Sequence, residues 1–110
     1  MKNIHLIEKT ARYNRVPEAD GQWTTGTWSM SPETAESLIG GKVFLHTKQE
    51  GPSYLGGEIL ECIPEAGNRY TIRFQFNEDA VNITTKYCKR NWSVEMLLEP
   101  VVKSERVNLI

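Results

Sequence analysis

Hydrophobic and polar residues alternate most clearly in residues 69–76, Arg-Tyr-Thr-Ile-Arg-Phe-Gln-Phe. A period of two is typical of a β-strand with one buried face. One side of the strand carries Tyr70, Ile72, Phe74 and Phe76, and the other carries Arg69, Thr71, Arg73 and Gln75. Aromatic and β-branched residues suit a half-buried sheet, so we expect the first set in the core and the second facing solvent or a ligand.

The same reasoning predicts several more short strands and one helix. A helix is expected over residues 32–39, because Ser31 is a good N-cap, Pro32 suits the first helical position and Gly40-Gly41 follows as a stop. Residues 11–21 read as a loop and residues 77–79 as a turn. Strands are expected at 1–9, 22–30, 42–47, 54–62 and 80–85. Residues 92–98 are expected to form a strand, with a short helix as the alternative, and residues 101–110 a last strand or a tail.

Glycines interrupt two of the expected strands. Gly26 separates Trp23 from Trp28, which leaves open whether the two indoles share a face. The pair Gly56-Gly57 indicates a bulge, a sharp bend or a close approach of two backbones. Short strands with glycine turns and one helix predict a mainly β fold, although an α+β class stays open. We expect a small, strongly bent β-barrel.

The length of 110 residues fits one domain. We expect an N-terminal strand and loop at 1–21, a barrel core at 22–100 and a tail or last strand at 101–110. The net charge of −1 argues against a globally basic protein but allows a local basic patch. The chain has no long apolar run and no signal-peptide pattern, which predicts a cytoplasmic protein without a membrane partner.

The order of features resembles the PUA-like superfamily, which includes the ASCH and EVE domains. The resemblance covers about residues 22–76. It rests on Trp23 or Trp28, the 32–39 helix, Gly41-Lys42-Val43-Phe44-Leu45 and Leu55-Gly56-Gly57-Glu58-Ile59. The family usually opens this strand with Gly-Asp, where this chain has Gly41-Lys42, and an SH3-like barrel shows nearly the same pattern. The resemblance implies a small barrel that binds RNA or a modified base.

A stretch without acidic residues between Asp79 and Glu95 is the main candidate for chemistry. Cations next to aromatic rings suit single-stranded nucleic acid, because cations meet phosphates and rings stack on bases. The candidate contacts are Lys86, Tyr87, Lys89, Arg90 and Trp92, extended by Arg69 and Arg73. The alternative is a solvated loop with Tyr87 and Trp92 in the core, beside the wet face of a sheet.

A second candidate is a ligand pocket formed by Trp28, His46, Ser53 and Tyr54. His46 could act as an acid or base only with a partner in reach, and the sequence shows none, so a structural histidine is the alternative, as for His5. Cys88 lies near three cations but lacks a base, and Cys62 fits the core.

We therefore expect a non-catalytic recognition module for single-stranded nucleic acid or a modified base, with no metal and no cofactor. A protein-interaction module or small inhibitor is the alternative, and a small hydrolase is a third class. Trp28, Tyr54, Tyr87 and Trp92 are the expected stacking residues.

Overall fold

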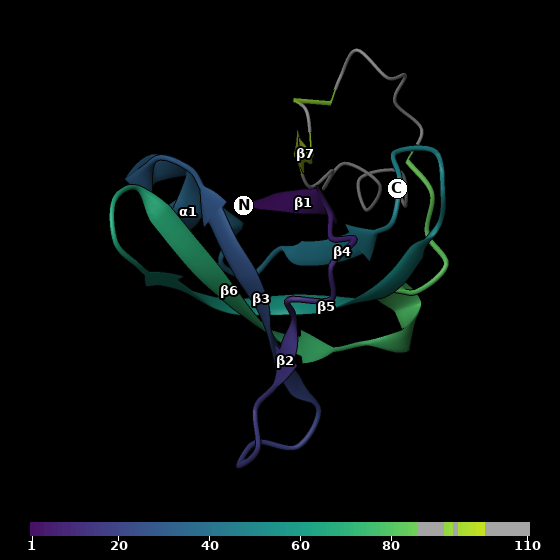
Figure 1. The fold of residues 1–110 in the computed structure, drawn as a ribbon, viewed down its shortest axis with the longest axis horizontal. Helices are drawn as coiled ribbons and strands as arrows, with labels where there is room; N and C mark the ends of the chain where they lie inside the picture. Colours follow the sequence, from purple (N-terminus) through teal and green to yellow (C-terminus); the bar gives the residue numbers. More distant parts are fainter. Residues whose placement is uncertain (86–91, 94, 101–110) are drawn as a thin grey trace, which may run out of the picture.

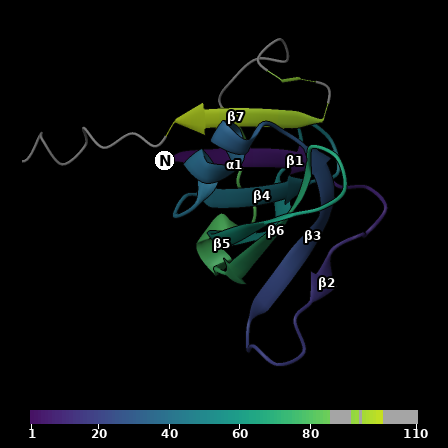
Figure 2. The ribbon, with the colours of Figure 1, turned by 90° about the vertical axis from the view of Figure 1, so that its left-hand side faces the viewer.

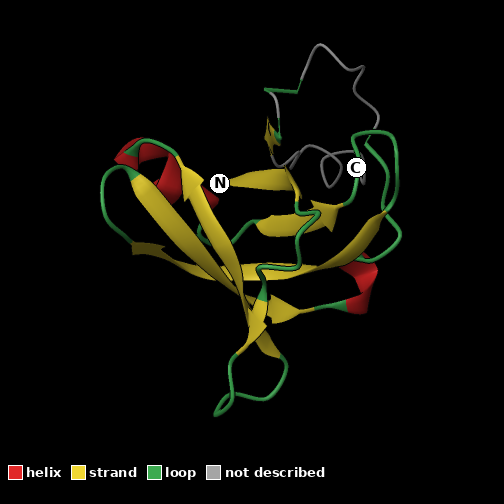
Figure 3. Cartoon of the chain, viewed as in Figure 1, coloured by secondary structure: helices red, strands yellow, loops and turns green. Residues whose placement is uncertain are grey.

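The computed structural model describes residues 1–85, 92–93 and 95–100 of the chain (Figure 1). Strands dominate it (Figure 3). The elements are β1 (Lys2–Ile7), β2 (Asn14–Arg15), β3 (Gln22–Ser29), α1 (Pro32–Leu38), β4 (Lys42–His46), β5 (Ser53–Pro64), β6 (Arg69–Phe76), the 3₁₀-helix η1 (Glu78–Ala80) and β7 (Met96–Pro100).

The strands form one seven-stranded sheet in the order β2-β3-β6-β5-β4-β1-β7. β1 pairs with β4 in parallel, and the other neighbouring strands pair antiparallel. Figure 2 shows β7, β1 and β4 side by side in that order. The mainly β class is confirmed, but the barrel prediction is wrong, because β2 and β7 are the two edges of an open sheet. Closure would require these edges to pair, and β2 contributes only two residues.

The core lies on the face of the sheet to which β6 contributes Ile72 and Phe74, both fully buried. Helix α1 adds Ala35 and Leu38 to the same core. Ser31 caps this helix as expected, since its hydroxyl accepts from the backbone N–H of Thr34 at 3.1 Å. A helix this short depends on packing for its stability, and α1 packs against β1 and β5.

A β-bulge in β3 resolves the question of the two tryptophans. Trp23 lies opposite Phe74 and Trp28 opposite Tyr70, with the register shift between Thr24 and Thr27. β3 therefore uses one residue more than β6 over this stretch, so both indoles point to the core face. The hydroxyl of Thr25 accepts from the backbone N–H of Ile72 at 3.1 Å, which partners an amide inside the irregular part of the ladder.

Gly57 explains the glycine pair in β5 as a close approach of two backbones. A Cβ atom at Gly57 would lie 1.8 Å from the carbonyl oxygen of Gln75 on β6. No side chain fits there, so the sequence signal marked tight strand packing rather than a bulge at this position. The register shift of β5 against β6 lies further along, between Ile59 and Glu61.

Phe76, which was expected in the core, is 40% exposed at the end of β6. Three expected elements also differ from the structure. The 80–85 strand is wrong, because η1 ends at Ala80, residues 81–82 form a bend and residues 83–85 have no regular secondary structure. The 92–98 strand is displaced to β7, since Ser93 makes only an isolated bridge with Met96. The 11–21 loop contains the two-residue strand β2. Among the described residues, the helices are too short to cross a bilayer.

Candidate ligand-binding site

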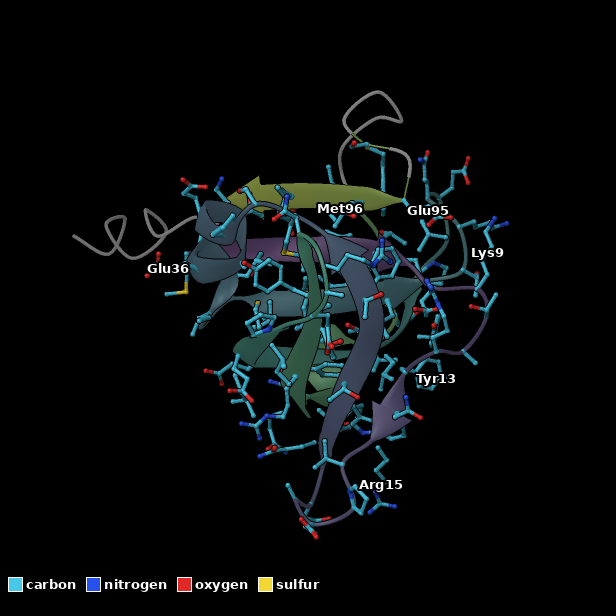
Figure 4. All side chains as sticks on the ribbon, turned by 60° about the vertical axis from the view of Figure 1, so that its left-hand side comes forward. Lys9, Tyr13, Arg15, Glu36, Glu95 and Met96 are labelled. Carbon is cyan, nitrogen blue, oxygen red and sulfur yellow. The ribbon has the colours of Figure 1, made fainter. Side chains whose placement is uncertain are left out.

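The segment that leaves β1 and leads into β2, residues 8–15, carries the best candidate site. In Figure 4, Lys9, Tyr13 and Arg15 follow one another down one side of the molecule, away from Glu36. Tyr13 packs against aromatic side chains of β3 and β5, and Arg12 lies over an aromatic ring of β3. This segment therefore places cations and an aromatic ring against other aromatic side chains of the sheet.

Glu8 begins this segment with a buried carboxylate, 1% exposed. Its Oε2 atom accepts from the Thr10 hydroxyl at 3.2 Å and from the backbone N–H and Nε–H of Arg12 at 3.4 and 3.3 Å. Its Oε1 atom has no hydrogen-bond partner among the described residues. A buried, unpartnered carboxylate oxygen is costly, so this atom needs a functional or solvent partner.

Trp28 lies in the same place, beneath Arg12. The guanidinium carbon of Arg12 is 5.6 Å from the centroid of the Trp28 ring, a cation–π contact. The indole is 6% exposed, and its Nε1–H lacks a hydrogen-bond acceptor among the described residues. An unpaired buried acceptor on Glu8 and an unpaired buried donor on Trp28 thus flank one arginine.

An aromatic cluster continues from this point. The ring of Tyr13 lies 5.9 Å from Trp23 and 5.8 Å from Tyr54 between centroids. The Tyr54 hydroxyl donates to the backbone carbonyl of Glu8 at 2.7 Å and so fastens the start of the segment to β5. Burial raises the pKa of Tyr54, and the neighbouring Tyr13 and Glu8 raise it further, so this hydroxyl stays a donor at neutral pH.

A pocket of about 260 Å³ adjoins the cluster near its far end. The apolar part of its lining comes from Trp23, Leu55 and Phe76, and the charged part from Arg15 and Asp20. Phe76 is 40% exposed, so its ring is accessible. A flat, apolar group next to a cation fits this lining.

A second cluster, the histidine network, joins β1, β4 and β7. His5 Nδ1 lies 2.9 Å from His46 Nε2, and His5 Nε2 lies 2.9 Å from Glu99 Oε1. His46 Nδ1 lies 2.9 Å from the carbonyl oxygen of Gly51. Both rings are buried, at 1% and 0% exposure. Burial lowers the pKa of His46, although its bond to Gly51 opposes the change.

The Gly51 carbonyl can only accept, so the Nδ1–H of His46 donates to it. The Nε2 atom of a neutral His46 then accepts from the Nδ1–H of His5. Folding brings His5 beside His46, a partner that the sequence does not show, and both rings are buried and hydrogen-bonded, which is the structural alternative given for them.

The expected arginines lie on the opposite, polar face of β6. Arg69 donates to the hydroxyl of Thr27 at 3.0 Å and to its carbonyl at 2.9 Å. Arg73 pairs with Glu61 at 3.0 Å. Both belong to a hydrogen-bonded solvent face, which was the alternative for these residues.

The remaining expected residues scatter. Trp92 is 8% exposed and its ring stands edge-on to His46, so it cannot offer a face to a base as expected. Ser53 is buried and its hydroxyl donates to the carbonyl of Ala80 at 2.7 Å. Of the expected pocket, Trp28 and Tyr54 belong to the site at Glu8, whereas His46 and Ser53 do not. Lys86, Tyr87, Cys88, Lys89 and Arg90 lie outside the described residues.

Sequence reasoning missed Glu8, Arg12 and Tyr13. A signal was present, because Lys9, Arg12, Tyr13 and Arg15 occur without an acidic residue between Glu8 and Glu18. This is the same pattern that drew attention to residues 80–94. Within the part of the chain that the structure describes, His, Cys, Asp and Glu form no group of three that could hold a metal ion.

Comparison with family models, curated proteins and solved structures gave no match to this chain. The resemblance to the PUA-like superfamily stays a prediction.

Proposed function

We propose that this protein is a non-catalytic recognition module that binds single-stranded nucleic acid along residues 8–15. The observation that carries the proposal is the buried Glu8 carboxylate, which has one unpaired oxygen and lies under Arg12 beside the Trp28 ring. Carboxylates read the N–H groups of bases, and indoles stack on their rings.

Cations and aromatic rings alternate around this point in a way that suits a strand of nucleic acid. Lys9 and Arg15 flank the site within one segment and are exposed, as phosphate contacts need to be. Arg15 also lies 3.9 Å from Asp20, in an exposed ion pair that contributes little and that a phosphate can replace. The pocket beside Trp23 and Phe76 offers a place for a neighbouring base. Each base that stacks on an aromatic side chain contributes about 1–3 kcal/mol.

The histidine network supports recognition rather than catalysis. All four ring nitrogens of His5 and His46 already take part in hydrogen bonds, and both rings are buried. A general acid or base must reach the proton that it transfers, and these rings present no nitrogen to a substrate.

A protein partner is the weaker candidate. Among the exposed large apolar side chains of the described residues, Met1 and Ile39 both lie next to Gly40, whereas Phe76 belongs to β6 and Leu98 to β7. Large contiguous apolar patches are what mark protein interfaces.

The test is fluorescence anisotropy with labelled single-stranded and double-stranded RNA and DNA across a salt series. We expect single strands to bind and the affinity to fall as salt rises, because bound cations release counterions from phosphates. The double variant Lys9→Ala/Arg15→Ala should weaken binding and reduce the salt slope by about one per lost phosphate contact.

Two control variants separate the competing surfaces. Arg69→Ala/Arg73→Ala removes the cations of the β6 solvent face, and Lys86→Ala/Lys89→Ala/Arg90→Ala removes those of the other basic stretch. Loss of binding in either control but not in the Lys9/Arg15 variant would move the site. No binding of any single strand at low salt would refute the proposed function.

A further inference from the structure

We propose that Glu8, Arg12 and Trp28 form a guanine site, in which the Arg12 guanidinium holds the place of the base in the free protein. This inference rests on the proposed function and names the base that the site reads.

Arg12 fills the site only in part. Its Nε–H meets Glu8 Oε2 at 3.3 Å, while Glu8 Oε1 stays unpaired. A carboxylate and a guanidinium pair best through two parallel N–H···O bonds, one to each oxygen. The side chain of Arg12 is also 49% exposed. A long, half-exposed side chain with a single long bond is free to swing aside, since such ion pairs contribute little.

Guanine contains the same chemical group. Its N1, C2 and exocyclic N2 atoms form a guanidine unit within the ring, and N1–H and N2–H point the same way from one edge. Placed on Glu8, these two donors would meet Oε1 and Oε2 together and so satisfy the unpaired oxygen. The flat ring would cover the Trp28 indole, where the guanidinium now lies.

The other bases fit the carboxylate less well. Adenine, cytosine and uracil have no two adjacent donors on the Watson–Crick edge, so a lone pair would face one oxygen of Glu8 when a donor meets the other. A lone pair facing a buried carboxylate is repulsive and leaves the oxygen unpaired.

Gly26 lies next to both Glu8 and Arg12. A Cβ atom at this position would lie 3.3 Å from Glu8 Oε1, 3.1 Å from Arg12 Cβ and 3.3 Å from Arg12 Nε. A methyl group there would crowd the carboxylate and the arginine without changing the charge of the site.

The decisive experiment uses the unmodified protein. Short oligouridines with one central guanosine, inosine, adenosine or cytidine are titrated by anisotropy at fixed salt. Inosine lacks only the N2 amino group, so it removes the one donor assigned to the second oxygen. We expect guanosine to bind about tenfold to a hundredfold more tightly than inosine, the range for a buried hydrogen bond to a charged group.

Two variants assign the preference to the site. Glu8→Gln replaces one acceptor oxygen by a donor and should bring guanosine and inosine to similar affinity, and Gly26→Ala should reduce the preference. Glu18→Gln is the matched control, an exposed carboxylate in the following loop, and should keep the preference. Circular dichroism checks that each variant is folded, and the inosine comparison stands without any variant.

The outcomes separate the two proposals. Equal binding of all the oligonucleotides would overturn the guanine site and leave nucleic-acid recognition intact. A guanosine preference that persists in Glu8→Gln would also overturn the assignment. If no oligonucleotide binds, a calorimetric titration with guanosine monophosphate decides: binding that Glu8→Gln abolishes keeps the guanine site without nucleic acid, and no binding refutes both.

Discussion

Replacing His46 by Gln should change how the stability of this protein depends on pH. In the native chain the buried His46 ring lies 2.9 Å from His5 Nδ1 through its Nε2 atom and 2.9 Å from the carbonyl oxygen of Gly51 through its Nδ1 atom. Burial lowers the pKa of His46. A glutamine amide does not titrate, so the variant lacks this pH-dependent contribution.

The sign follows from counting the protons that His46 binds in the folded and unfolded states. Because burial lowers the pKa of His46 below 6.5, this ring stays neutral in the folded state at a pH where the unfolded ring is already charged. The unfolded state then binds more protons, so the free energy of unfolding should fall as pH falls below 6.5, by at most about 1.4 kcal/mol per pH unit from this group. Stability from this group is complete above pH 6.5.

The assay is urea unfolding followed by circular dichroism between pH 5 and 9, with Glu18→Gln as a control at an exposed position. The quantity to compare is the difference in unfolding free energy between each variant and the native chain at each pH. His46→Gln should be less stable than the native chain above pH 6.5, and this difference should shrink as the pH falls. A difference that stays constant over the whole pH range would refute the reasoning.

The remaining predictions concern the sheet and its thiol. Gly57→Ala should lower the free energy of unfolding in urea by roughly 3 kcal/mol or more, because its Cβ would lie 1.8 Å from a backbone oxygen of β6. Gly67→Ala is the control: with φ +71 and no atom within 4 Å of its Cβ, it should lower this free energy by only about 1–2 kcal/mol. Equal losses in the two variants would contradict the close approach of the two backbones at Gly57. Burial, helped by the charge of Glu61, raises the pKa of Cys62 to about 11, so about one thiol in a thousand is ionised at pH 8. Iodoacetamide should modify Cys62 at least about tenfold more slowly in the folded chain than in urea. Peptide mass spectrometry measures the two rates, and equal rates would show that the thiol is accessible in the folded chain.

Much of the fold follows from local sequence signals. The alternation in residues 69–76 predicted the polar face of β6 and the buried Ile72 and Phe74, but not the exposure of Phe76. The Ser31-Pro32 signal predicted the start of α1. The closure of the sheet could not be predicted in this way. It depends on whether two edge strands, far apart in the sequence, have enough paired residues to meet, and no local pattern reports that.

The candidate site was harder to predict because its parts are non-local. Glu8 looks like an ordinary surface residue in the sequence, since charged side chains are rarely buried. Only the fold shows that its carboxylate is enclosed, and that a hydroxyl from β5 holds its backbone. Conversely, the cations and rings of β6 and residue 92 matched a binding pattern, yet Arg73 is paired with Glu61 and Trp92 is buried.

The bulge in β3 links the fold to the site. Trp23 and Trp28 are five positions apart, so in a regular strand one of them would face solvent. The additional residue turns both to the core face, where one indole lines the apolar pocket and the other lies beneath Arg12. The same bulge places Gly26 next to the unpaired oxygen of Glu8. The additional residue of β3 thus turns both indoles to one face and places a glycine beside the Glu8 carboxylate. Deleting this residue should separate the two indoles even in a sheet that still folds.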